Sequence, residues 1–178
     1  MGTLARDIDL SVDVAGLNIG SPTMLASGIL GISYEVLKRV HEAGAGAVVS
    51  KSISIEPREG YKNPTVVGVD AGYINAVGLS NPGVDAFVNE IRNNESVPII
   101  VNLVGSTEDE FVSMVRKFDG LKILAYELNL SCPHVEKVGL EVGDDPELVS
   151  KIVKSMKSNT STPVIAKVGL GASDIVET

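Results

Sequence analysis

A lone cysteine, Cys132, lies in a short segment that is dense in groups able to do chemistry. Within six residues the chain carries the amide of Asn129, the hydroxyl of Ser131, this thiol and the imidazole of His134. Pro133 has no N–H group to donate, so regular strand pairing ends here and a loop begins. An α/β enzyme places reactive groups at the carboxyl ends of its strands, whereas an arbitrary lone cysteine is more often a small buried apolar residue. The polar neighbours and the loop position favour chemistry over packing.

Two lysines end apolar segments in equivalent positions, Lys51 after residues 47–50 and Lys167 after residues 164–166. A lysine is almost never buried unless it is paired, and the simplest alternative is an ammonium group that reaches solvent from a strand end. Two cations that face one cavity would repel each other unless an anion lies beside them. We therefore expect these lysines to face an anionic substrate or an electron-rich cofactor.

The elements that must position these groups are short apolar segments that alternate with amphipathic ones. Strands are expected at residues 24–28, 47–51, 98–102, 123–129 and 163–167, and helices at residues 34–43, 84–93, 108–118 and 146–157. Another helix is expected to begin at residue 173. Residues 10–19 alternate apolar and polar types and predict a hairpin, whereas residues 53–82 are rich in Gly, Pro and Asn and predict a long irregular segment.

Local signals mark where three of the helices begin. Ser33, Thr107 and Asp145 are the expected N-cap residues, because their side-chain oxygens accept from the first backbone N–H groups of a helix. Glu110 stands three residues after Thr107, as in a capping box. Pro146 occupies the first helical position, where its missing N–H group costs nothing.

Strands that are apolar throughout, separated by amphipathic helices, predict an α/β fold with a parallel sheet covered by helices. Such a chain forms either an open doubly wound sheet or an eight-stranded barrel. Polar residues at the carboxyl ends of successive strands would lie along a line in the open sheet but converge on one mouth in the barrel. These residues are Ser27, Lys51, Asn102, Asn129 and Lys167. We therefore interpret residues 1–178 as a single domain, the first part of a TIM (β/α)8 barrel that begins with a hairpin and lacks its later strands.

The composition argues against several classes of function. The 178 residues carry a net charge of -8 and only 4% aromatic residues, which disfavours nucleic-acid binding. One cysteine excludes an internal disulfide framework and a cysteine-rich metal site, so we expect no metal. The sequence shows no apolar signal core and no stretch of about 18 apolar residues, and it predicts a cytoplasmic protein that does not enter a membrane.

An ordered set of motifs spans residues 25–167. Each motif is weak alone, but the full set in this order resembles the dihydroorotate dehydrogenases, specifically the cysteine-using class 1 enzymes. The motifs are Ala26-Ser27-Gly28, Ser50-Lys51-Ser52, Glu56 to Gly60, Asn75 to Gly83, Val101 to Gly105, Glu127 to Pro133 and Ala166-Lys167.

The resemblance implies an FMN-bearing barrel that oxidises dihydroorotate to orotate in pyrimidine (UMP) biosynthesis. Cys132 would be the general base that takes a proton from ring carbon 5, while a hydride passes from ring carbon 6 to the flavin. Lys51 and Asn129 would contact both ligands. The implied substrate loop consists of Asn75, Ala76, Val77, Gly78 and Leu79. The other implied flavin contacts are Ser27, Ser52, Asn102 and Lys167.

Departures from the family pattern leave two other interpretations open. His134 stands where the family often has asparagine, and the run from Asn129 to His134 is also similar to the flavin domain of dihydropyrimidine dehydrogenase, which reduces uracil and thymine. The other interpretation is a non-catalytic fragment that binds partners through an open sheet edge. In the NAD-linked subgroup of the family, a separate subunit with FAD and an iron–sulfur cluster passes electrons onward. A homo-oligomer is also expected.

Overall fold

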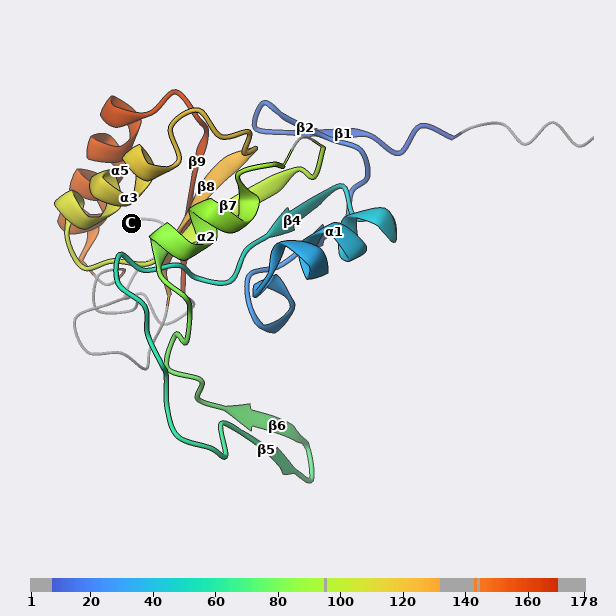
Figure 1. Cartoon of the computed structure of the whole chain (residues 1–178), viewed down its shortest axis with the longest axis vertical. Helices are drawn as coiled ribbons and strands as arrows, with labels where there is room; N and C mark the ends of the chain where they lie inside the picture. The colour runs from blue at the N-terminus through green and yellow to red at the C-terminus, as the bar shows by residue number, and fades with distance from the viewer. Residues whose placement is uncertain (1–7, 95, 132–142, 144, 170–178) are drawn as a thin grey trace, which may run out of the picture.

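The computed structural model describes residues 8–94, 96–131, 143 and 145–169 of the chain. Its centre is a five-stranded parallel sheet with the strand order β3-β4-β7-β8-β9. The strands are β3 (Met24–Leu25), β4 (Ala47–Val49), β7 (Ile99–Leu103), β8 (Ala125–Leu130) and β9 (Val164–Val168). Two hairpins accompany this sheet (Figure 1), β1 (Val12–Val14) with β2 (Leu17–Ile19) and β5 (Val66–Val69) with β6 (Gly72–Asn75).

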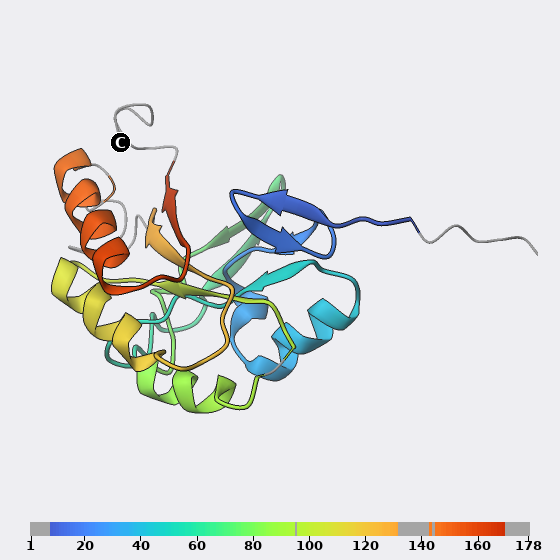
Figure 2. The ribbon, with the colours of Figure 1, turned by 90° about the horizontal axis from the view of Figure 1, so that it is seen from above.

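Helices connect the neighbouring strands, as the alternating sequence pattern predicts. They are α1 (Tyr34–Glu42), α2 (Val84–Ile91), α3 (Glu108–Lys117) and α5 (Pro146–Asn159), with a short 3-10 helix, η1 (Ile29–Gly31), before α1. Figure 2 shows these helices along one side of the sheet, following its curve. A doubly wound sheet reverses its strand order and carries helices on both faces. The described strands follow one another across the sheet in the order of the chain, and the described helices cover only one face of the sheet. This is the pattern of a barrel.

The two faces of the sheet belong to different cores, because successive side chains of a strand point in opposite directions. The outer face packs against buried residues of all four α-helices and includes Val48, Ile99, Val101, Tyr126 and Leu128. The inner face packs against Leu17 and Ile19 of β2 and includes Ala47, Val49, Ile100 and Ala125. The predicted hairpin over residues 10–19 therefore covers the inner face near the start of the strands. It does not cover the carboxyl ends, where a ligand site is expected.

The helix starts agree with the predicted N-cap positions but not with every predicted bond. Oδ1 of Asp145 accepts from the backbone N–H of Leu148 at 3.0 Å, as expected of a cap. Ser33 stands at the N-cap position of α1, yet its side chain makes no capping bond. The N–H of Tyr34 instead donates to Oε1 of Glu90 in α2 at 2.6 Å. A carboxylate on a neighbouring helix thus binds one of the first N–H groups of α1, a partner that sequence spacing does not reveal.

The capping box at the start of α3 is half formed. The backbone N–H of Glu110 donates to Oγ1 of Thr107 at 3.3 Å, as predicted. The carboxylate of Glu110 accepts from the backbone N–H of Ser106 at 2.7 Å, one residue before the cap, rather than from Thr107. The carboxylate therefore ties the segment before the N-cap to the first turn of α3.

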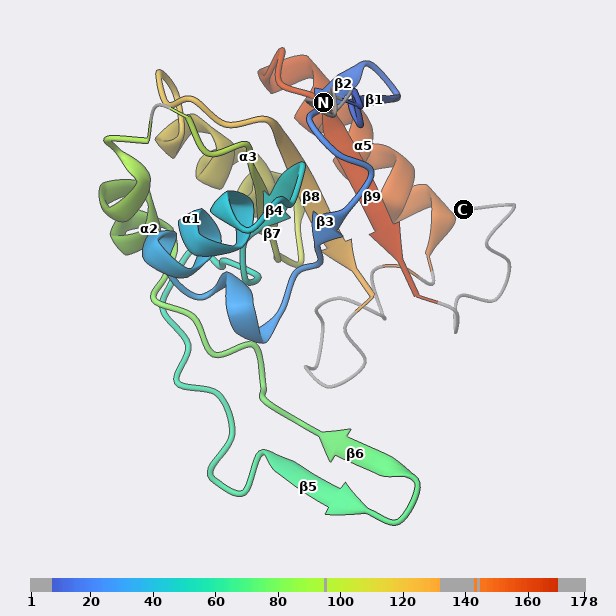
Figure 3. The same ribbon diagram turned by 90° about the vertical axis from the view of Figure 1, so that its right-hand side faces the viewer.

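The prediction of an irregular segment over residues 53–82 is wrong in its middle. There the chain forms the β5–β6 hairpin, in which Val66 pairs with Asn75 and Val69 with Gly72. All the residues of both strands are exposed, and the hairpin projects away from the parallel sheet (Figures 1 and 3). A strand pair without a buried face shows no alternation of apolar and polar residues, so period-two reasoning missed it. The helix expected from residue 173 lies outside the described residues.

Candidate active site

The inner face of the sheet becomes polar at the carboxyl ends of the strands. Asn102 shares this face with Ile100, because side chains two residues apart on a strand point the same way. Glu127 and Asn129 share it by the same spacing from Ala125. Three polar side chains from β7 and β8 therefore lie above the apolar inner core.

Lys167 joins this polar layer from β9, and Lys51 follows the end of β4. Lys167 of β9 is the register partner of Asn129. Lys51 lies two residues after Val49 of β4, and both lysines are half-buried. The strand register thus brings Asn129 and Lys167 together on one face, whereas Lys51 lies beyond the paired residues of β4.

A hydrogen bond between Lys167 and Ser27 shows how strongly the sheet curls. Nζ of Lys167 donates to Oγ of Ser27 at 3.2 Å, although β9 and β3 are the two edge strands of the sheet. In a flat sheet, four spacings of about 4.8 Å would hold these edges roughly 19 Å apart. That distance exceeds the reach of one lysine side chain. The sheet must therefore bend until its carboxyl ends surround a common mouth, as a barrel requires.

Asn129 is the centre of a hydrogen-bond network at the end of β8. Its side chain is buried, and Nδ2 donates to Oγ of Ser52 at 3.0 Å. Its Oδ1 accepts from both the backbone N–H and the hydroxyl of Ser131, at 3.2 and 3.0 Å. Asn129 thereby fixes the residue that immediately precedes Cys132. Cys132, Pro133 and His134 lie outside the described residues, so the role of Cys132 as general base stays a prediction.

Glu127 is a candidate site residue that the sequence analysis did not single out. Its carboxylate Oε1 accepts a hydrogen bond from Nδ2 of Asn102, its register partner on β7. It is the one charged residue of the strand 125–130, and that was the signal that could have found it. Glu127 also adds a negative charge to the face that carries Lys167. The protein itself therefore supplies part of the compensating charge that was expected from a ligand alone.

A cavity of about 410 Å³ lies beside Lys51. Its lining includes Val77 of the predicted substrate loop, and the complete set is Ile32, Lys51, Thr65, Val66, Val77, Ser80, Asn81 and Pro82. Asn75 and Ala76 are exposed and do not line this cavity, whereas Leu79 is buried. Gly78 adopts a φ of 73°, and a Cβ there would lie 2.9 Å from the backbone N of Tyr61. The predicted loop thus contributes Val77 to the cavity lining and packs tightly against Tyr61 at Gly78.

Asn81 clamps one wall of this cavity. Its Oδ1 accepts from the N–H groups of Ser54 and Gly83, at 3.2 and 2.9 Å. Its Nδ2 donates to Oγ of Ser54 and to the carbonyl of Leu79, at 2.9 and 2.8 Å. Every hydrogen-bonding position of this buried amide is engaged in holding the chain, so Asn81 is a positioning residue rather than a ligand.

A backbone contact also holds Lys51 in place. Its N–H donates to the carbonyl of Gly31 at 2.7 Å, which joins β4 to η1. A side chain at Gly31 would overlap the backbone of Ser50 and Lys51. Glycine is therefore required at this close approach of two segments.

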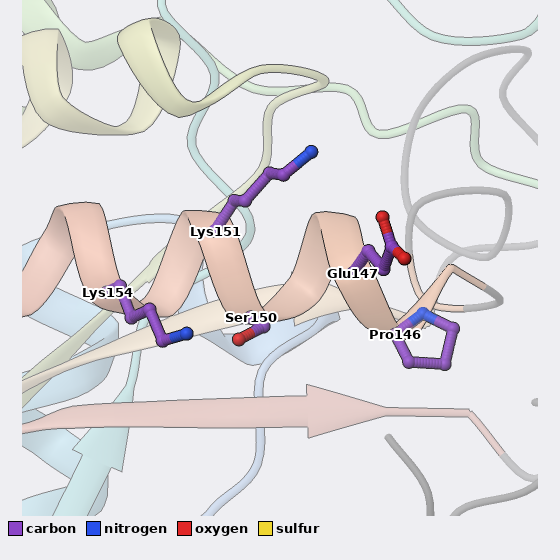
Figure 4. Close-up of a pocket in the computed structure, with 5 residues that line it drawn as sticks. All are labelled: Pro146, Glu147, Ser150, Lys151 and Lys154. Carbon is purple, nitrogen blue, oxygen red and sulfur yellow. The ribbon is translucent and has the colours of Figure 1, made fainter.

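A second cavity, of about 340 Å³, lies on α5 and holds none of the predicted site residues. Its lining consists of Pro146, Glu147, Ser150, Lys151 and Lys154 (Figure 4). Figure 4 shows the amino groups of Lys151 and Lys154 pointing apart, so they do not form one cationic site. Among the described residues, no three His, Cys, Asp or Glu side chains are grouped so as to hold a metal ion.

Comparisons with known proteins identify relatives of the chain. The family model described as dihydroorotate dehydrogenase matches residues 9–178. The catalytic subunit of dihydroorotate dehydrogenase B (NAD(+)) from Pyrococcus furiosus is 46% identical over 171 residues, which cover 96% of this chain and 57% of that protein. The subunit of the same name from Thermoplasma acidophilum is 49% identical over 171 residues, covering 95% of this chain and 57% of that protein. The chain thus spans little more than half the length of these relatives.

A solved structure supports the fold. The crystal structure of DHODH from Eimeria tenella in complex with ferulenol matches with a TM-score of 0.73. The match covers 88% of this chain and 45% of that protein, at 23% sequence identity. At this identity the likeness shows the fold alone. Together with the uninterrupted strand order, it identifies the described sheet as part of a (β/α)8 barrel.

Proposed function

The chain belongs to the dihydroorotate dehydrogenase family, and we propose that the protein oxidises dihydroorotate to orotate with FMN as its flavin, a step of pyrimidine (UMP) synthesis. One observation carries this proposal beyond family membership. Asn102, Asn129 and Lys167 share the inner face at the carboxyl ends of the strands, which is where barrel enzymes hold their ligands, and Lys51 follows the carboxyl end of β4.

The polar residues of this face fit a flavin ring. The edge of the ring carries one imide N–H between two carbonyl oxygens, and it needs acceptors and donors in alternation. Oδ1 of Asn102 is a buried acceptor to which no described residue donates. Ser27, Ser52 and Lys167 add hydroxyl and ammonium donors. When bound, FMN would supply the acceptor for the hydride that leaves ring carbon 6, and a cation such as Lys167 favours the reduced, negatively charged ring.

The cavity beside Lys51 suits a small anionic substrate. Its volume of about 410 Å³ lies within the usual range of ligand sites, about 300–1,000 Å³. The ammonium group of Lys51 offers a charge partner for the carboxylate of dihydroorotate. We assign to Asn75, the first residue of the implied substrate loop, a hydrogen bond to the same carboxylate or to the ring amide. Because Asn75 is exposed at the end of β6, this contact requires the loop to turn toward the cavity when substrate binds.

Proton removal is assigned to Cys132. Its thiolate would take the proton from ring carbon 5, while Lys51 and Asn129 orient the ring. Asn129 reaches the catalytic loop through its two hydrogen bonds to Ser131, the residue before Cys132. A general base acts only within hydrogen-bond reach of the proton it removes, so this anchoring is the contribution that the described residues make to the step.

The relatives named as NAD(+) catalytic subunits point to a partner. We propose that a separate subunit with FAD and an iron–sulfur cluster takes electrons onward, and that the protein is a cytoplasmic homo-oligomer. In the described part of the chain, no helix is both long and apolar enough to cross a membrane.

The test is ligand binding by the protein expressed from its complete reading frame. We expect bound or added FMN to give a flavin absorbance spectrum, and orotate to perturb that spectrum at lower concentration than uracil. A preference for uracil would favour dihydropyrimidine reduction instead. Failure to take up FMN at all would refute the proposed activity and leave the non-catalytic interpretation.

A further inference from the structure

Asn102 has one hydrogen-bonding atom for which the described part of the chain supplies no partner. Its backbone N–H donates to Oγ of Ser50 at 2.9 Å, and its carbonyl accepts from the N–H of Ile53 at 2.9 Å. Its Nδ2 donates to the carboxylate of Glu127. Oδ1 is buried, and none of the described residues donates to it. A buried acceptor without a donor is costly, so this oxygen marks a place for a donor from outside the described residues.

The carboxylate of Glu127 determines which way this amide points. An asparagine side chain presents an acceptor on one side and a donor on the other, and either orientation fills the same space. An ionised carboxylate only accepts hydrogen bonds, so it holds Nδ2 toward itself. The reverse orientation would bring Oδ1 against Oε1 of Glu127, two acceptors in contact. Glu127 therefore leaves Asn102 with only its oxygen to offer elsewhere.

We propose that Glu127 is a positioning residue that locks Asn102 as a hydrogen-bond acceptor for the imide N–H of a bound ligand. The inference rests on the proposed function, which supplies two ligands with this group. The flavin ring and orotate each carry an imide N–H between two carbonyls, and within that imide only the N–H can donate to Oδ1. A flipped amide would donate to a carbonyl instead, so without Glu127 the site would lose its preference for the N–H.

The perturbation that isolates this role is Glu127→Gln, which keeps the side-chain shape but supplies an amide that pairs with either orientation of Asn102. The probes are FMN and FMN methylated at the imide nitrogen, each titrated into the flavin-free protein by quenching of flavin fluorescence. In the wild-type protein, loss of the N–H should weaken binding about fivefold to tenfold, the value of one hydrogen bond, beyond any steric effect of the methyl group. In Glu127→Gln this excess penalty should disappear.

A second arm identifies which ligand donates. Orotate and its imide-methylated analogue are titrated into both proteins, loaded with FMN, by the change in flavin absorbance. The donor to Asn102 is the ligand for which methylation weakens binding more in the wild-type protein than in Glu127→Gln. Either ligand supports the positioning role of Glu127.

Two further variants serve as a control and as an alternative to Glu127→Gln. Glu90→Gln is the matched control, because that carboxylate also accepts a hydrogen bond, from the N–H of Tyr34, but between helices on the outer side. It should retain the wild-type penalty. Should Glu127→Gln fail to fold, Glu127→Asp retains the charge, draws the carboxylate back by one methylene, and should also lose the penalty.

The outcomes separate the inference from the proposed function. Equal methylation penalties in the wild-type protein and the Glu127 variants, for both ligands, would overturn the positioning role while leaving flavin binding intact. A wild-type protein that binds neither FMN nor orotate would overturn the proposed function, and the inference with it.

Discussion

Replacing Asn129 by alanine should loosen the structure that leads into Cys132. The substitution removes the donor to Ser52 and the acceptor for both the N–H and the hydroxyl of Ser131. Because the side chain is buried, solvent replaces these bonds poorly. The last described residue before Cys132 would then no longer be tied to the end of β8.

The magnitude follows from the three bonds. Each contributes about 1 kcal/mol net to the free energy of unfolding, so Asn129→Ala should lower that free energy by about 3 kcal/mol. Ser131→Ala removes only the hydroxyl bond to Oδ1 and should cost about 1 kcal/mol. In a protein that already carries Asn129→Ala, the Ser131→Ala change should cost almost nothing, since its partner is gone.

The assay is urea unfolding of the flavin-free wild-type protein, the two single variants and the double variant, with free energies from linear extrapolation. Ser158→Ala is the control, because its hydroxyl bonds an exposed carbonyl of α5 and its loss should be near neutral. The reasoning is refuted if Ser131→Ala costs the same with and without Asn129, because the two side chains would then be energetically independent.

Three other substitutions test how the site and its core are held. Gly31→Ala should destabilise the protein by about 3 kcal/mol or more in urea unfolding, because the new Cβ overlaps the backbone of Lys51; Gly20→Ala, which has open space around it, should be near neutral. Lys51→Ala should weaken both FMN and orotate in absorbance titrations, whereas unchanged titrations would remove Lys51 from both sites. Burial, with a smaller effect of Asp119, raises the pKa of Tyr126 above its usual 10.0. Above pH 10 the folded protein therefore holds a proton on Tyr126 that the unfolded chain releases. The free energy of unfolding is unaffected by this group below pH 10 and decreases above it. Tyr126→Phe should reduce that loss by on the order of 1 kcal/mol near pH 11, and an unchanged pH profile would contradict the assignment.

Hydrophobic pattern was enough to predict the parallel sheet and its helices, because each strand and helix buries a face whose period appears in the sequence. Alternation of strands and helices predicts that β8 and β9 are neighbours, but the register that pairs Asn129 with Lys167 comes from the structure. The β5–β6 hairpin was missed because it buries neither face, so residues such as Val66 and Ile74 are exposed. A cap such as that of Tyr34 by Glu90 depends on which helices become neighbours, and local sequence does not encode it.

The sequence predicted which residue types form the candidate site, but not which of these residues contact one another. Strand-end position identified Lys51, Asn102 and Lys167. Contact between Lys167 and Ser27 needs the curl of the whole sheet, since the two residues are 140 positions apart. Glu127 was passed over because a single charge in a strand has many possible partners. Only the register with Asn102 makes it a positioning residue.

The central claim is that Cys132 is the base in FMN-dependent oxidation of dihydroorotate. Its most direct test is the rate at which dihydroorotate bleaches the flavin absorbance under anaerobic stopped-flow conditions, measured in wild-type and Cys132→Ser proteins loaded with FMN. Loss of a general base should slow this reduction by about 10²-fold to 10⁴-fold, with orotate affinity nearly unchanged. Comparable reduction rates in the two proteins would contradict the account.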